Sequence, residues 1–101
     1  MEQRPVAHVY EAFRDYMPKF MANRTRDHAA LLAALEAGDL ARIAAIGHSL
    51  AGNCGTYGFH LMTQLGRDLE AAAEAGDRPA LVAHIAELAR QIDQTEIVYQ
   101  A

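Results

Sequence analysis

The tetrapeptide Glu-Ala-Gly-Asp occurs at residues 36–39 and again at residues 74–77. In each copy the glycine suits the left-handed end of one helix, and the aspartate suits the N-cap of the next helix. The two copies therefore predict two tight corners between helices. Nothing else repeats in register between them, so the pattern indicates shared corner chemistry rather than an array of helical repeats.

Apolar residues between these corners recur at spacings of three and four, which is the period of an amphipathic helix, and no alternating strand pattern is visible. We predict helices over residues 39–55, 58–75 and 78 to about 98, preceded by a long helix that begins near Pro18. Inside a helix, Pro18 would remove a hydrogen bond and clash with the preceding turn, so it suits the first turn. The predicted core positions are Leu40, Ile43, Gly47, Leu50, Cys54, Leu61, Leu65, Leu69, Ala72, Leu81, Ile85, Leu88 and Ile92.

A further short helix is expected ahead of Pro18. Its stripe contains Val6, Phe13 and Met17, with either Val9 or Tyr10. The stripe continues after Pro18 through Phe20 or Met21, Arg24, His28, Leu31 and Leu35. We therefore predict an all-α fold, an antiparallel up-and-down four-helix bundle with a short additional N-terminal helix. A length of 101 residues suits a single domain, residues 1–101.

Composition limits the function. Of the 101 residues, 51% are hydrophobic and 22% are charged, with a net charge of −4 and scattered basic residues, which argues against a nucleic-acid surface. Cys54 is the only cysteine, so an internal disulfide is impossible. No signal peptide and no apolar run near ~18 residues is present, so we expect a soluble cytoplasmic protein that does not enter a membrane.

His48 lies within IGHSLAGNCGTYGF, residues 46–59, among residues with small side chains. At about 100° of rotation per residue, the core stripe of its helix centres roughly 130° away, so His48 should be exposed. Its neighbours on the same face are Ala41, Ala44, Ala45, Ala51, Gly52 and Gly55. Glycine costs about 1 kcal/mol relative to alanine within a helix. Gly47, Gly52 and Gly55 therefore indicate room left for helix packing or for another macromolecule.

Residues around His48 resemble the signature of the histidine-containing phosphotransfer (HPt) domain family. The matching residues are His48-Ser49-Leu50-Ala51-Gly52, then Tyr57-Gly58-Phe59, then Leu65, Leu69 and Glu70. An upstream stretch is also similar to the preceding helix of one HPt subgroup, through Asn23, Arg24, Leu31, Leu32, Leu35, Gly38 and Asp39. The resemblance covers roughly residues 18 to 76, and the last helix matches in pattern only.

This resemblance implies that His48 accepts a phosphoryl group from a kinase or a receiver aspartate and passes it to another receiver. A neutral imidazole is a good nucleophile near pH 7, which suits this role. In the family, an acidic or amide side chain of the next helix holds the Nδ1 proton and frees Nε2, and Glu70 occupies the matching position. The implied surface for the approaching receiver comprises Ala44, Ala45, Ala51, Gly52, Gly55 and Gly58.

The chain departs from the family at Ala51, where a lysine usually helps to hold the phosphoryl oxygens. Arg67 is a candidate to supply the missing cation, and it is equally suited to a surface ion pair with Glu70 or Glu74. Two functions therefore stand. The first is an active phosphorelay carrier, and the alternative is a phosphotransfer-deficient docking module that binds receivers without carrying phosphate.

Other readings of the sequence are weaker. Among His8, His28, His60 and His84, no pair has the i, i+4 spacing of a metal site, and no metal or cofactor is expected. The spaced glycines after His48 lack a Gly-Lys-Ser/Thr ending, so we expect no nucleotide binding and no autokinase activity. The expected partners are receiver domains and a hybrid sensor histidine kinase, with the protein itself a monomer. Self-association through the first helix is a further alternative.

Overall fold

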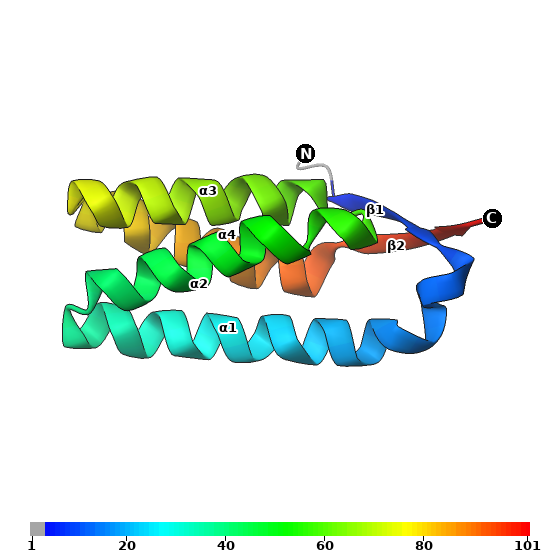
Figure 1. Ribbon diagram of the computed structural model, residues 1–101, viewed down its shortest axis with the longest axis horizontal. Helices are drawn as coiled ribbons and strands as arrows, with labels where there is room; N and C mark the ends of the chain where they lie inside the picture. Colours follow the sequence, from blue (N-terminus) through cyan, green and yellow to red (C-terminus); the bar gives the residue numbers. More distant parts are fainter. Residues whose placement is uncertain (1–3) are drawn as a thin grey trace.

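Four helices make up most of residues 4–101, the part of the chain that the computed structural model describes. They are α1 (Met17–Ala37), α2 (Leu40–Asn53), α3 (His60–Ala75) and α4 (Arg78–Gln94). Figure 1 shows that successive helices run in opposite directions alongside one another. The predicted number of helices is confirmed. The predicted domain, residues 1–101, includes three residues that lie outside the described part.

Both Glu-Ala-Gly-Asp corners form as predicted, at the same end of the bundle (Figure 1). Gly38 and Gly76 adopt positive φ angles of 69° and 66°, where a side chain would be strained. The carboxylates of Asp39 and Asp77 each accept a hydrogen bond from the backbone N–H three residues further on. Pro18 lies in the first turn of α1, where its missing N–H costs no helical hydrogen bond.

The predicted N-terminal helix is not formed as a single helix with a stripe from Val6 to Met17. The chain instead forms strand β1 (Val6–Tyr10) and then a 3₁₀ helix, η1 (Glu11–Tyr16). Along β1 the side chains alternate, with Ala7 and Val9 buried and their neighbours exposed. Valine and tyrosine favour strands, and a helix this short would be marginal in water. The strand is preferred because a partner elsewhere in the chain satisfies its backbone.

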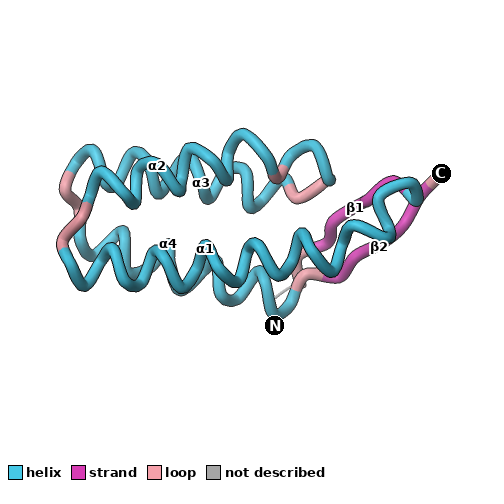
Figure 2. Tube along the Cα trace, turned by 60° about the horizontal axis from the view of Figure 1, so that its bottom comes forward, coloured by secondary structure: helices cyan, strands magenta, loops and turns pink. Residues whose placement is uncertain are grey.

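That partner is β2 (Glu96–Gln100), so the prediction that the last helix reaches residue 98 is also wrong. The two strands pair in parallel, with Val6 opposite Glu96 and Tyr10 opposite Gln100. Figures 1 and 2 show this ribbon projecting from the end of the bundle opposite the two corners. The fold is therefore a four-helix bundle with a two-stranded parallel sheet, rather than all-α.

The core lies between the helices and extends under β1. Its fully buried members include Phe20, Leu31, Ile43, Leu50, Met62, Leu69, Leu81, Ile85 and Leu88. Two predicted core positions are wrong, since Leu40 and Leu61 are 38% and 54% exposed. Leu40 begins α2 at the corner, and on α3 the neighbouring Met62 takes the inward position that Leu61 was expected to fill.

α2 and α3 meet at two buried glycines, Gly47 and Gly66. A Cβ atom on Gly66 would lie 2.5 Å from the Gly47 carbonyl oxygen, and one on Gly47 would lie 2.6 Å from the Gly66 carbonyl oxygen. Backbone atoms cannot rotate aside, so only glycine permits this separation of the two helices. The buried side chains of Leu50 and Leu69 flank the contact and hold the helices together through apolar packing.

A second close backbone contact joins β1 to the segment between α2 and α3. This segment contains a 3₁₀ turn, η2 (Gly55–Tyr57), which ends at Gly58 with a φ of 87°. A Cβ atom on Gly58 would lie 2.1 Å from the His8 carbonyl oxygen. Gly58 therefore satisfies two demands, a left-handed backbone and room for the strand.

Replacing Gly58 with alanine tests this contact. Gly38 has a similar φ of 69°, and a Cβ atom there would meet nothing within 4 Å, so Gly38→Ala provides a matched control. We expect Gly38→Ala to cost about 1 kcal/mol, from the left-handed backbone alone. Gly58→Ala should cost about 3 kcal/mol or more, because it adds the clash with β1. Urea unfolding measures both, and equal losses would contradict the assigned contact.

Candidate functional site

His48 lies on the outer side of α2, and its side chain is 78% exposed, as its small neighbours predict. Its Nδ1 atom is 3.3 Å from Oε2 of Glu70, which projects from α3 and is 33% exposed. The structure thus brings together the imidazole and the carboxylate that the sequence singled out. A carboxylate at this distance favours the imidazole tautomer that carries its proton on Nδ1.

Exposed ion pairs contribute only roughly 0 to 1 kcal/mol, because water competes for both groups. The contact between His48 and Glu70 therefore cannot hold α2 and α3 at their present separation. The apolar core and the glycine contact between the helices set that separation instead. The fold therefore positions the pair, and the pair adds little to stability.

Arg67 is exposed on α3, one turn before Glu70. Its sequence neighbour Gly66 faces the backbone of Ala51, since a Cβ on Gly66 would lie 2.7 Å from the Ala51 nitrogen. The residue before Arg67 in the chain thus contacts Ala51, the position at which the resemblance implies a lysine. Within residues 4–101, none of the ion pairs involves Arg67, so the alternative of a surface pair with Glu70 or Glu74 is not observed.

The six small residues predicted to receive a partner form three pairs with different surroundings. Ala45 and Gly52 are exposed, and a Cβ on Gly52 would meet nothing within 4 Å. Ala44 and Ala51 are half-buried on the same helix. The other two members, Gly55 and Gly58, are half-buried and face the protein itself: a Cβ on Gly55 would lie 3.2 Å from Thr63 Oγ1, and Gly58 faces β1.

A buried polar cluster was missed by the sequence interpretation. Arg24 is only 8% exposed, lies over the Phe20 ring, and donates a hydrogen bond of 2.9 Å to Asp27 Oδ2. It also donates to Cys54 Sγ at 3.6 Å. Burial raises the pKa of the Cys54 thiol, and the nearby Arg24 guanidinium partly opposes that shift. The available signal was a cation on the core stripe of α1 and a thiol on that of α2.

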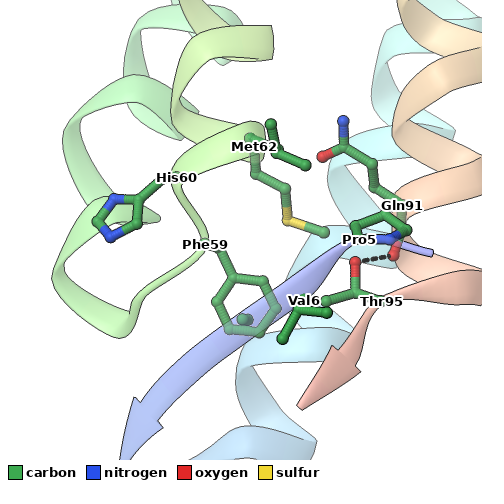
Figure 3. A pocket seen from close by; sticks show the side chains of 9 residues that line it. Pro5, Val6, Phe59, His60, Met62, Gln91 and Thr95 are labelled. Atoms are coloured by element: carbon green, nitrogen blue, oxygen red, sulfur yellow. Dashed lines mark hydrogen bonds between the residues drawn. The ribbon is translucent and has the colours of Figure 1, made fainter. Parts of the chain in front are cut away.

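The structure also contains a hollow between β1, the start of α3 and the end of α4 (Figure 3). Its lining includes Val6, Phe59, Met62 and Gln91, whereas the His60 ring points away from the other labelled side chains. Neither His48 nor Glu70 lines it, so the hollow is separate from the exposed imidazole.

Neither a metal-binding cluster nor a membrane-spanning helix is found within residues 4–101. In that range, no three side chains of histidine, cysteine, aspartate or glutamate are grouped so that they could hold a metal ion. None of its helices is both long enough and apolar enough to cross a membrane.

The geometry defines a class of protein: a helical bundle that presents an exposed imidazole beside a carboxylate from the adjacent helix. The family model described as Hpt domain matches residues 9–97, nearly the whole chain. The chain belongs to the Hpt domain family, whose members are phosphotransfer carriers that interact with receiver domains and kinases in phosphorelays. Comparison with curated proteins and with solved structures gave no match.

The raised pKa of Cys54 predicts an unreactive thiol. At pH 8 a raised pKa leaves less thiolate than an ordinary cysteine has, and the side chain is fully buried. We expect iodoacetamide to alkylate the folded protein about a hundredfold more slowly than the protein unfolded in urea. Mass spectrometry of timed samples measures both rates, and equal rates would show that the thiol is accessible.

Proposed function

We propose that this protein carries a phosphoryl group on His48 between a kinase or a receiver aspartate and a second receiver domain. The observation that carries the proposal is the exposed imidazole whose Nδ1 lies 3.3 Å from the Glu70 carboxylate. A carrier must accept its group from one protein and give it to another, so its reactive atom has to be reachable. The high exposure of His48 meets that requirement.

The contact assigns a different role to each ring nitrogen. Glu70 holds the proton on Nδ1, so the lone pair of Nε2 is free to attack the phosphorus of an aspartyl phosphate. The Nε2–P bond forms, the P–O bond to the aspartate breaks, and the aspartate leaves as a carboxylate. The positive charge that develops on the imidazole is stabilised by Glu70, the same logic by which a carboxylate assists histidine in catalytic triads.

The surface around His48 supports docking of another protein. Ala45 and Gly52 leave open space beside the imidazole, and no side chain longer than a methyl group projects there from these positions. A receiver can therefore bring its phosphorylated aspartate close to Nε2. We assign the receiver contact to Ala44, Ala45, Ala51 and Gly52, and exclude Gly55 and Gly58 because they pack against the protein itself.

Arg67 is proposed to stabilise the phosphoryl oxygens in place of the family lysine. It directly follows Gly66, which contacts Ala51, and it forms none of the ion pairs found in residues 4–101. Its guanidinium carries several hydrogen-bond donors on a long side chain, and such groups bind phosphate oxygens well.

Phosphoryl transfer from a labelled receiver tests the proposed carrier. Incubation with a receiver domain phosphorylated on its aspartate should give acid-labile, alkali-stable label on the wild-type protein. His48→Gln should abolish the label, and His60→Gln, which changes an exposed histidine outside the site, should retain it. Label on His48→Gln would reject the proposal. A wild-type protein that binds the receiver without accepting label would establish the docking module instead.

Two substitutions test the source of the cation. Hydrogen bonds to charged groups contribute about 1.5 to 3 kcal/mol, so Arg67→Gln should slow phosphoryl transfer roughly ten- to a hundredfold. Ala51→Lys should raise the wild-type rate and restore the rate of Arg67→Gln, because it places an ammonium one turn from His48. Rapid-quench kinetics measures these rates. An unchanged rate in Arg67→Gln would show that the arginine takes no part.

A further inference from the structure

We propose that Gly47 and Gly66 are positioning residues, which place the Glu70 carboxylate within reach of His48 by allowing the backbones of α2 and α3 to touch. This inference rests on the proposed phosphoryl-carrier function. It assigns part of the site to two residues that have no side chain and make no contact with the imidazole.

The two glycines lie next to His48 and Glu70 in their helices, so a change in the distance between α2 and α3 would change the distance between these two side chains. Gly47 directly precedes His48, and Gly66 lies one turn before Glu70. A Cβ on Gly47 would lie 3.0 Å from the Glu70 backbone nitrogen. The helix contact therefore includes the backbone of the residue that supplies the carboxylate.

The atoms that an added Cβ would meet at either glycine cannot easily move aside, so the distance between α2 and α3 would have to change. A Cβ on Gly66 would meet the Gly47 carbonyl oxygen at 2.5 Å, the Ala51 nitrogen at 2.7 Å and Leu50 Cβ at 2.9 Å. None of these atoms is the far end of a flexible side chain. An alanine at either glycine must therefore move α2 and α3 apart, or rotate one against the other.

Such a movement would be transmitted to the site because nothing else there opposes it. The contact between His48 and Glu70 is exposed and weak, so it cannot draw the helices back together. Each glycine lowers the stability of its helix by about 1 kcal/mol relative to alanine. This cost is consistent with a role in the close contact between α2 and α3. Gly52 does not share this role, because a Cβ there would meet nothing within 4 Å.

The first measurement is the imidazole tautomer, which does not depend on any phosphodonor. Long-range ¹H–¹⁵N NMR at mildly alkaline pH, where imidazoles are neutral, reports the fraction of His48 that carries its proton on Nδ1. We expect Gly66→Ala and Glu70→Ala to lower this fraction to the same level. In Gly66→Ala/Glu70→Ala the fraction should fall no further, because both changes remove the same contact.

The second measurement is the rate at which phosphoramidate phosphorylates His48, with transfer of its phosphoryl group to Nε2 and loss of ammonia. Gly66→Ala should slow this reaction about tenfold in the wild-type background and leave it unchanged in the Glu70→Ala background. Circular dichroism and thermal unfolding monitor the fold, with Gly52→Ala as the stability control. Gly52→Ala should stabilise the protein, and Gly66→Ala should destabilise it.

Glu70→Asp gives a test that keeps both glycines and the helix packing unchanged. It withdraws the carboxylate from His48 by one methylene. We expect it to lower both the fraction of His48 protonated on Nδ1 and the rate of phosphorylation. This test remains available if Gly66→Ala fails to fold. Wild-type values in Glu70→Asp, or in a folded Gly66→Ala, would overturn the positioning role and leave the carrier function standing. The positioning role would also be overturned if the phosphorylation rate of Gly66→Ala/Glu70→Ala fell by the product of the two single effects. Unchanged phosphorylation in His48→Gln would instead overturn the carrier function, whatever the tautomer shows.

Discussion

The contact between the α2 and α3 backbones at Gly47 and Gly66 is the constraint on which the rest of the site depends. Burial of Leu50 and Leu69 provides the free energy that draws the helices together, and the glycines determine how near they come. At this separation a side chain of modest length spans from one helix to the other. An exposed histidine can therefore lie within reach of a carboxylate and remain accessible to another protein.

The helices and corners could be predicted because their determinants are local. Gly38 and Asp39 specify a helix end and a helix start within two residues, and periodicity specifies the faces between corners. The ribbon could not be predicted in this way. Val6, Phe13 and Met17 fit a helical period, and the alternation of β1 is only five residues long. Its pairing with residues 96–100 decides the conformation, and neither segment indicates that partner by itself.

Those parts of the site that depend on local spacing were also predicted, whereas those that depend on contacts between segments were not. The spacing within α2 predicts that His48 is exposed, and the resemblance to the HPt family pointed to Glu70 on the next helix. Gly55 and Gly58 were predicted to lie on the receiver surface, and the structure places both half-buried against other segments of the chain. Gly66 was not singled out from the sequence, because its close contact is with the backbone of Gly47 and Ala51 on α2. Contacts between helices depend on their relative register, which the pattern of one helix does not specify.

The parallel ribbon has a consequence for the order of folding. Arg4 donates a hydrogen bond to the Gln94 carbonyl oxygen across 90 positions, whereas each Glu-Ala-Gly-Asp corner joins helices that are adjacent in the chain. Closing the longer loop costs more chain entropy. Neighbouring helices can therefore collapse first, and the bundle then serves as the template on which the two distant strands find their register.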